Sequence, residues 1–211
     1  RVAALLDAPL VMDCVDVDLN TGLAKTSQYS GKVMAQIQLT GEILVFGVRP
    51  NAVLPEPRPV KAQIVAMTGE AAVPENITLL SWDDGDADGR QSLVEADIII
   101  AGGRGLKNRD NFSLIFECAE KLNAVPGASR VAVDEGWVPY ALQVGQTGEK
   151  VSPQVYIACG ISGSIQHFAG MKTAGMIIAV NRDENAAIMA NCDYQVLGDL
   201  FEILPEITRQ L

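Results

Sequence analysis

The single histidine of the 211-residue chain stands where a strand, a glycine turn and a helix are expected to meet. His167 closes the segment Gly160-Ile-Ser-Gly-Ser-Ile-Gln-His167, which follows an apolar run over residues 155–159. A turn between a strand and a helix leaves main-chain N–H groups free to bind phosphate. The polar pair Gln146-Thr147 lies shortly before this segment. Together these residues predict a site for a dinucleotide that carries a polar ring system.

Familiar catalytic and metal-binding motifs are incomplete in this chain. Gly103-Arg-Gly-Leu-Lys-Asn108 lacks the third glycine of the G-x-G-x-x-G pattern, and neither Gly-Lys pair continues as a Walker A motif. Gly160-Ile-Ser-Gly-Ser164 has serine where a nucleophile elbow requires glycine. With one histidine and no cysteine cluster, we expect no metal site.

The elements around these residues alternate between strands and helices from residue 96 onward. Such alternation is typical of βαβ units in a doubly wound parallel sheet. The apolar patterns predict strands over residues 96–102, 131–133, 155–159, 176–180 and 194–197, and helices over 112–122, 165–171 and from 199. Ligands of such sheets bind beyond the carboxyl ends of the strands. Polar or glycine-rich segments fall there, over residues 102–107, 127–130, 160–167, 181–183 and 198–199.

The first part of the chain has the pattern of a partial, strand-rich α/β domain over residues 1–82. Apolar alternation predicts strands over residues 11–19, 33–39, 42–48, 60–66 and 77–82. The acidic residues 83–90 have nothing to bury and no later EF-hand glutamate, so they predict a linker. Residues 91–211 form the second predicted domain. Because Arg1 opens within an apparent helix end, we expect a fragment of a longer subunit.

Composition excludes several partner classes. The net charge of −10 disfavours nucleic acid and anionic lipid as partners. No apolar run approaches the roughly 20 residues that span a bilayer. The four cysteines, Cys14, Cys118, Cys159 and Cys192, are widely spaced, and we expect buried, reduced thiols.

Five motifs, in order and at the right intervals, resemble the alpha subunit of electron transfer flavoprotein, a FixB-like family. They are Gly102-Gly-Arg-Gly-Leu-Lys107, Pro126-Gly-Ala-Ser-Arg130, Gln143-Val-Gly-Gln-Thr-Gly148, Tyr156-Ile-Ala-Cys-Gly-Ile-Ser-Gly-Ser-Ile-Gln-His167 and Gly198-Asp-Leu-Phe201. The resemblance is close over residues 96–211 and weaker over 1–80. It departs at Ala101, at Glu135 and over residues 181–187, none of which is an expected ring contact.

The resemblance implies a Rossmann- or flavodoxin-like, DHS-like domain that binds FAD. It implies that Arg130 lies against the isoalloxazine ring, that Gln146 and Thr147 bond its polar edge, and that His167 approaches the C2 carbonyl. It also implies that the remaining flavin and pyrophosphate contacts come from Arg104, Ser129, Val144, Gly145, Ser162, Gly163, Ser164, Ile165 and Gln166. The adenosine end would meet Asn181, Asp199 and Leu200.

Electrostatics independently favours a cation beside such a ring. Reduction places negative charge on the N1–C2=O edge, and a cation about 4 Å away contributes roughly 4 kcal/mol at an effective dielectric of 20. Arg130 cannot lose its proton, and His167 can add a hydrogen bond or a charge. The expectation is an anionic semiquinone stabilised by Arg130 and His167.

The resemblance further implies an electron carrier rather than an enzyme. It would pair with a beta subunit, take electrons from acyl-CoA or other dehydrogenases of fatty acid β-oxidation, and pass them to a quinone reductase or similar acceptor. The compartment would be the cytoplasm of a bacterium or the mitochondrial matrix of a eukaryote. Two alternatives remain open: a module with a structurally bound nucleotide, as in the middle domains of thiamine-dependent enzymes, and a subunit of an electron-bifurcating complex.

Structural roles compete with binding roles at several of these positions. Arg104 and Arg130 could form plain ion pairs, and His167 could be a buried core histidine. Asn181 could close a turn, and Asp199 could be a helix N-cap as well as a ligand contact.

Overall fold

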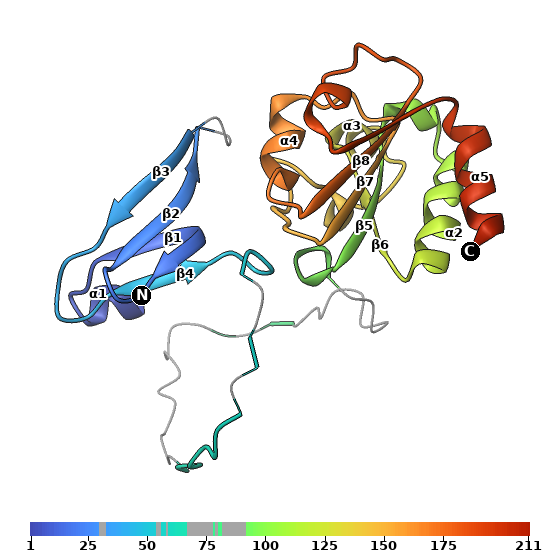
Figure 1. The fold of residues 1–211 in the computed structure, drawn as a ribbon. Coiled ribbons are helices and arrows are strands. Elements are labelled where there is room, and N and C mark those ends of the chain that lie inside the picture. Colours follow the sequence, from blue (N-terminus) through green and yellow to red (C-terminus); the bar gives the residue numbers. More distant parts are fainter. Residues whose placement is uncertain (30–32, 54–55, 58, 67–77, 79, 82–91) are drawn as a thin grey trace. The chain divides into compact units, whose positions relative to one another are not determined.

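The computed structural model describes residues 1–29, 33–53, 56–57, 59–66, 78, 80–81 and 92–211. Within these ranges the strands form two separate sheets (Figure 1). The predicted linker over residues 83–90 lies outside the described residues, as does half of the strand predicted over 77–82. The predicted domain boundaries therefore remain predictions.

The first sheet has four strands in the order β3-β2-β1-β4. A short helix α1 (Val2–Leu5) precedes it, and its strands are β1 (Leu10–Asp18), β2 (Leu23–Gln28), β3 (Val33–Gln38) and β4 (Val45–Val48). The β1–β2 and β2–β3 pairs are antiparallel, whereas β4 runs parallel to β1. Val11, Cys14 and Ala24 form a small core. Three of the predicted strands are confirmed here.

Two sequence predictions about this part of the chain are wrong. Strand β2 was not expected, because its sequence is largely polar, yet Ala24 and Thr26 alternate into the buried face. No strand forms over residues 60–66, where Val60 and Ile64 are 81% and 94% exposed. Apolar alternation is compatible with a strand, but a strand also needs a partner for its hydrogen bonds, and β2 has one on each side.

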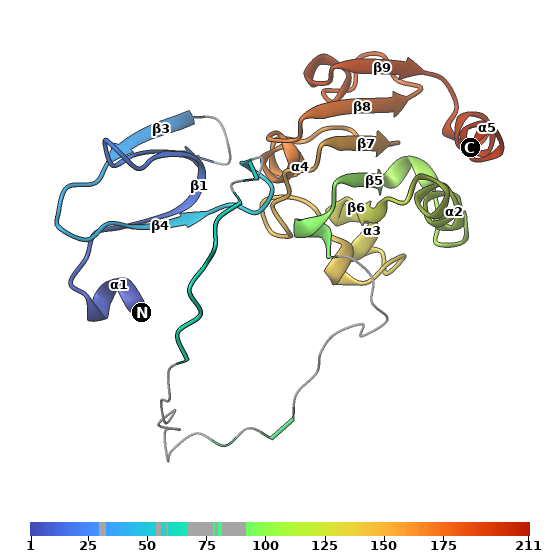
Figure 2. The same cartoon turned by 60° about the horizontal axis from the view of Figure 1, so that its bottom comes forward.

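The second sheet has five parallel strands in the order β6-β5-β7-β8-β9 (Figure 2). They are β5 (Ile98–Gly102), β6 (Val125–Ala128), β7 (Val155–Cys159), β8 (Met176–Asn181) and β9 (Tyr194–Leu197). The chain enters this sheet at β5, places β6 beside it at one edge, and then continues on the other side of β5 through β7, β8 and β9. The doubly wound parallel sheet predicted from the sequence is confirmed.

One strand of this sheet was placed wrongly by the sequence pattern. The strand expected over residues 131–133 is part of helix α3 (Arg130–Asp134), and the strand β6 precedes it. Pro126 and Gly127 conceal β6, because both residues weaken a strand pattern. Proline is tolerated in strands at a sheet edge, which is where β6 lies.

Helices cover both faces of the second sheet (Figure 1). α2 (Ser113–Leu122) and α5 (Leu200–Gln210) pack beside each other on one face, and α4 (Ile165–Met171) lies on the other. Successive residues of β5 point into different cores: Ile100 joins the cluster of α2 and α5, whereas Ile99 joins that of α4. Short 3-10 helices complete the fold over Leu93–Glu95, Arg104–Leu106, Asp110–Phe112, Tyr140–Leu142 and Met189–Asn191.

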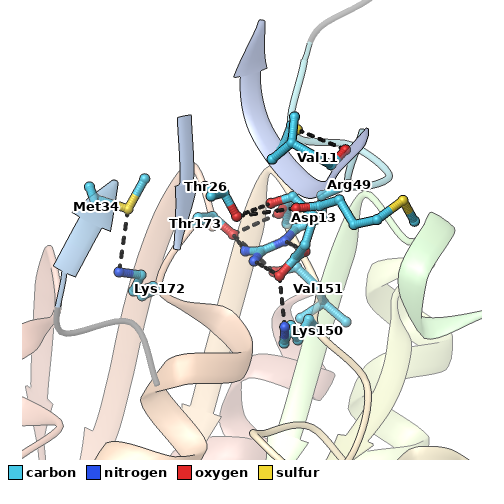
Figure 3. A network of polar contacts seen from close by, with 12 residues as sticks. Val11, Asp13, Thr26, Met34, Arg49, Lys150, Val151, Lys172 and Thr173 are labelled. Atoms are coloured by element: carbon cyan, nitrogen blue, oxygen red, sulfur yellow. Dashed lines mark hydrogen bonds and ion pairs between the residues drawn. The ribbon is translucent and has the colours of Figure 1, made fainter. Parts of the chain in front are cut away.

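A charged cluster links residues far apart in the sequence (Figure 3). Arg49 donates from Nε and Nη2 to both carboxylate oxygens of Asp13, at 2.7 and 2.9 Å, and from Nη1 to Thr173 Oγ1 at 3.0 Å. Lys150 Nζ bonds Asp13 Oδ2 at 2.7 Å, and Ser152 Oγ lies 2.6 Å from Thr173 Oγ1. These five residues are called the Asp13–Arg49 network below.

The cysteines in the described residues are all free, and Cys192 is half-buried while the other three are buried. The described part of the chain contains no helix long and apolar enough to cross a membrane. It also contains no group of three histidine, cysteine or acidic side chains placed to hold a metal ion.

Candidate functional site

A cavity of about 850 Å³ opens where the second sheet's strands end. Because the five strands are parallel, the segments that follow them lie at one edge of the sheet, as the sequence predicts. The volume suits a ligand of cofactor size. Most of the predicted contact residues line this cavity: Arg104, Ser129, Arg130, Val144, Gly145, Gln146, Thr147, Ser162, Ser164, Gln166, His167 and Asn181.

Four predicted contact residues lie outside the main cavity wall. Asp199 and Leu200 line a neighbouring cavity of about 50 Å³, which shares Asn181 with the main one. Gly163 and Ile165 line neither cavity. Gly163 has a φ of +78°, and a Cβ there would lie 2.3 Å from the main-chain nitrogen of Ile188, so this glycine serves the turn itself.

Sequence reasoning missed several residues of the cavity wall. They are Gly105, Val131, Asp134, Gln143, Gly160, Ile161, Arg182, Asp183 and Ala186. The sequence pattern assigns Val131 to a strand over residues 131–133, whereas helix α3 (Arg130–Asp134) places both Val131 and Asp134 in the cavity wall. Gly105, Gly160 and Gln143 already stood in the segments and motifs that carried the prediction.

Two of these glycines bring the loops after β5 and β7 into direct main-chain contact. A Cβ on Gly105 would lie 2.6 Å from the Cα atom of Gly160, and Gly105 N donates to Gly160 O at 2.9 Å. No side chain fits between the two loops. At these two glycines the cavity wall is therefore main chain.

Thr147 is held in place from two sides. Buried Gln143 donates from Nε2 to Thr147 Oγ1 at 3.1 Å, and the hydroxyl of Tyr140 donates to the main-chain oxygen of Thr147. A threonine hydroxyl that accepts one hydrogen bond still has its own hydrogen to donate. Thr147 can thus offer an oriented donor to a ligand in the cavity.

His167 is buried and electrically neutral at pH 7. Its side chain lies 5% exposed, and its Nε2 atom is 3.0 Å from the hydroxyl of Tyr156. Burial lowers the pKa of His167 to about 4, although the main-chain carbonyl of Val144 acts in the opposite direction. Of the two contributions expected from the sequence, the structure favours a hydrogen bond over a charge.

Arg130 begins helix α3 and brings a positive charge to the cavity wall. Its Nε atom lies 3.1 Å from Asp134 Oδ2, and its side chain is 66% exposed. Arg130 therefore forms an ion pair and also lines the cavity. An exposed pair of this kind contributes at most about 1 kcal/mol, so a ligand can rearrange it at little cost.

Asn181 and Asp199 both perform structural work at the ends of strands β8 and β9. Asn181 donates from Nδ2 to Ile161 O at 3.0 Å and accepts from Asp183 N at 3.1 Å. Asp199 caps α5, because its Oδ1 accepts from Phe201 N at 2.9 Å. Contact of these residues with the adenosine end of a ligand stays a prediction.

Two buried polar atoms in the cavity wall have no hydrogen-bond partner among the described residues. They are Ser129 Oγ and His167 Nδ1. Ser129 stands at the N-cap of α3 but makes no side-chain cap bond. More than nine in ten buried polar groups are bonded in folded proteins, so two orphans in one cavity indicate that a polar ligand completes them. A flavin dinucleotide, which carries both hydrogen-bond donors and acceptors, fits this wall.

Comparison with known proteins assigns the chain to a family. The model of the electron transfer flavoprotein FAD-binding domain matches residues 92–172, and that of the electron transfer flavoprotein domain matches residues 1–75. The electron transfer flavoprotein subunit alpha of Paracoccus denitrificans is 41% identical over 213 residues, which cover 100% of this chain and 68% of that protein. This chain belongs to the electron transfer flavoprotein alpha subunit family. The cofactor of its second domain is FAD, as the resemblance implied.

Relatives come from bacteria and from an animal. The subunit alpha of Pseudomonas aeruginosa is 40% identical, covering 99% of this chain and 67% of that protein. A probable mitochondrial subunit alpha of Caenorhabditis elegans is 38% identical, covering 100% of this chain and 63% of that protein. The chain spans 65% of the length of the related Mycobacterium leprae subunit alpha.

Proposed function

We propose that this chain carries FAD in the cavity at the carboxyl edge of its parallel sheet and serves as a one-electron carrier. In this proposal FAD supplies the redox chemistry, accepting electrons from a dehydrogenase and releasing them singly. The observation that supports it most directly is the pair of unpartnered buried atoms, Ser129 Oγ and His167 Nδ1, in one cavity with the cation of Arg130.

Arg130 would supply permanent positive charge beside the reduced ring. Its contribution falls below the roughly 4 kcal/mol expected for an unscreened neighbour, because the guanidinium is exposed and Asp134 neutralises part of it. Charge that develops only on reduction is stabilised by a cation whose charge does not depend on pH. Arg130 would therefore favour the singly reduced anionic flavin.

Hydrogen bonds from Thr147 and Gln146 would orient the ring. Thr147 has a hydroxyl hydrogen available, and Gln146 is fixed through its main-chain N–H, which donates to Gln166 O at 2.7 Å. Arg104 and Ser162 would lie along the rest of the dinucleotide. These donors are held by protein bonds before a ligand arrives, which lowers the entropic cost of binding.

The proposed partners and compartment are those that membership of the family suggests. The chain would pair with a beta subunit, accept electrons from acyl-CoA or other dehydrogenases, and deliver them to a quinone reductase or similar acceptor. It would act in the cytoplasm of a bacterium or the mitochondrial matrix of a eukaryote. It would be an electron carrier rather than an enzyme, in keeping with the electron transfer flavoproteins it resembles.

Stepwise anaerobic reduction of the FAD-loaded protein with dithionite tests this function. The red absorbance of the singly reduced anion should accumulate near half-reduction in the wild type and fall severalfold in Arg130→Ala, with FAD still bound. Arg130→Lys should recover part of the yield. The matched control is Arg209→Ala, which removes another exposed ion pair, with Glu206, and neither of those residues lines the cavity.

Each result separates the proposal from its rival. Wild-type flavin that passes straight to the doubly reduced form refutes the one-electron role. Wild-type accumulation with an equal yield in Arg130→Ala supports the one-electron role but removes Arg130 as the cation that stabilises the reduced ring. A protein that does not bind added FAD contradicts the proposal and favours a nucleotide-binding module or a fragment too incomplete to bind FAD.

A further inference from the structure

The hydroxyl of Tyr156 is the partner that the structure gives to the side chain of His167. Tyr156 is the second residue of β7, and its side chain is fully buried. The hydroxyl oxygen lies 3.0 Å from His167 Nε2, and the two rings are tilted by 59°. Tyr156 does not line the cavity, whereas His167 does. The contact therefore reaches the site from behind its wall.

Hydrogen-bond counting decides which atom donates in this contact. If Tyr156 donates to Nε2, the imidazole hydrogen sits on Nδ1, which makes no hydrogen bond of standard geometry among the described residues, although the Val144 carbonyl acts on the ring and raises its pKa. If Nε2 donates instead, Nδ1 is a bare acceptor without a donor, and the hydroxyl hydrogen of Tyr156 also lacks an acceptor. Each buried unsatisfied group costs about 1–3 kcal/mol. The first arrangement leaves fewer groups unsatisfied.

Burial keeps both partners neutral. Desolvation raises the pKa of the Tyr156 hydroxyl well above its ordinary value, so the phenol keeps its hydrogen. Desolvation also lowers the pKa of His167 to about 4, so the imidazole carries a single hydrogen at pH 7. A neutral phenol that keeps its proton and a neutral imidazole fit donation from oxygen to Nε2.

The surrounding fold fixes both ends of the pair. Strand β7 lies between β5 and β8, so the main chain of Tyr156 is held by hydrogen bonds on both sides. His167 N donates to the hydroxyl of Ser164 at 3.3 Å in the first turn of α4. The main chain that carries each ring is therefore held in place, and both rings are buried.

We propose that Tyr156 is a positioning residue that locks His167 as the neutral tautomer with its hydrogen on Nδ1. His167 then enters the flavin site as a hydrogen-bond donor and not as a cation. The tautomer rests on the Tyr156–His167 geometry alone, whereas the meeting of Nδ1–H with flavin rests on the proposed function. The positive charge at the ring would come from Arg130, and His167 would add direction rather than charge.

The single histidine makes this tautomer directly observable. In protein labelled with ¹⁵N-histidine, long-range ¹H–¹⁵N spectra contain one imidazole, so no assignment is needed. The FAD-free wild type should show a protonated, pyrrole-type Nδ1 and a bare, pyridine-type Nε2, unchanged from pH 8 to about pH 5. A hydrogen on Nε2, or a doubly protonated ring at pH 7, overturns the proposal without any variant.

Two tyrosine variants then test the cause. Tyr156→Phe removes the donor, so the Nε2 signal should move away from the pyridine-type position as the second tautomer becomes populated. Tyr194→Phe, which alters a tyrosine 59% exposed on β9, should leave the spectrum unchanged. A Tyr156→Phe spectrum identical to the wild type shows that Tyr156 does not set the tautomer.

Added FAD separates this inference from the proposed function. On binding, the Nδ1 signal should shift while Nε2 keeps its bare character, and the yield of singly reduced flavin should be lower in Tyr156→Phe than in the wild type. If the hydrogen stays on Nδ1 but FAD does not bind, the proposed function is refuted, whereas the role of Tyr156 in setting the tautomer stands. FAD binding with an unmoved Nδ1 signal removes His167 as a donor to the flavin.

Discussion

The Asp13–Arg49 network and the cavity wall bury polar side chains in opposite ways. In the network, Arg49 is only 2% exposed, yet all three of its guanidinium nitrogens have partners, and both oxygens of Asp13 accept hydrogen bonds. In the wall, Ser129 Oγ and His167 Nδ1 are buried without a partner among the described residues. Polar atoms satisfied by the chain itself hold a fold together, whereas unsatisfied ones mark where the chain leaves bonds for another molecule.

The pKa of Asp13 reflects the hydrogen bonds and charges that surround its carboxylate. Burial raises the pKa of Asp13, but hydrogen bonds and charges from Arg49 and Lys150 together outweigh burial and hold the pKa below its ordinary value. At His167 burial wins, because no acidic side chain compensates for it among the causes that act on its pKa. Burial thus keeps His167 neutral in the cavity wall, whereas in the network the cations beside Asp13 overcome the effect of burial and keep its carboxylate charged.

Removing the buried cation should produce the largest change in stability. Arg49→Met leaves the Asp13 carboxylate without its two-point partner, and removal of one member of a buried pair costs about 3–5 kcal/mol. We expect a loss of about 3 kcal/mol, because Lys150 still reaches Asp13. Urea unfolding at pH 7 measures it. Lys150→Met, which removes a cation 44% exposed, should cost less than about 1 kcal/mol, and equal losses from the two variants would contradict the comparison.

Acid should weaken the cavity region before the network. The pKa of His167 falls from 6.5 to about 4 on folding, so between these values the unfolded chain binds a proton that the folded one excludes. The stability is present in full above about pH 6.5 and falls as the pH drops toward 4, by about 3 kcal/mol over the whole window. Asp13, whose folded pKa is lowered, loses its contribution only as the pH falls below its ordinary value of 3.8.

Urea unfolding of the wild type and His167→Gln between about pH 7.5 and 4.5 isolates this effect. The variant lacks the chain's one imidazole, so the difference between the two stability curves belongs to His167. The difference should narrow steadily toward low pH. A difference that is constant across this range would mean that His167 titrates normally in the folded protein.

The smallest effect should come from the unsatisfied hydroxyl. Ser129→Ala in FAD-free protein should change stability by less than about 0.5 kcal/mol, or increase it, because the removed oxygen has no partner among the described residues. The matched variant Ser164→Ala removes a cap that accepts from His167 N, and should cost about 1 kcal/mol. With FAD present, Ser129→Ala should weaken FAD binding, measured by flavin fluorescence. A large loss without FAD would show that Ser129 already has a partner.

The sequence predicts the fold well where a single feature, such as a short apolar run, determines the local structure. The strands around Ile99, Ile157 and Ile178 are short and apolar because helices cover both faces, and that pattern is typical of buried parallel strands. Strand β6 was missed because Pro126 is acceptable only at an edge, and a sequence does not state which strand lies there. Strand β2 was missed because its neighbours, rather than its own side chains, stabilise it.

The candidate site was readable at a coarser level. Segments that follow parallel strands must share an edge, so residues as distant as Arg104 and Asn181 could be grouped without a structure. The surroundings of Arg130 could not be predicted in this way. Its ion pair with Asp134 depends on helix α3, part of which the sequence pattern predicts as a strand. The neutrality of His167 likewise depends on burial, which spacing does not reveal.

The contact between Gly145 and Gly170 has a consequence for redesign. A Cβ on Gly170 would lie 2.4 Å from Gly145 N, and close by Gln146 N donates to Gln166 O at 2.7 Å. The loop that carries Thr147 and the helix that carries His167 are therefore joined main chain to main chain. The distance between this loop and this helix is therefore set by the main chain and not by side chains. An engineer can exchange the side chains on either face for other chemistries while the gap between them keeps its width.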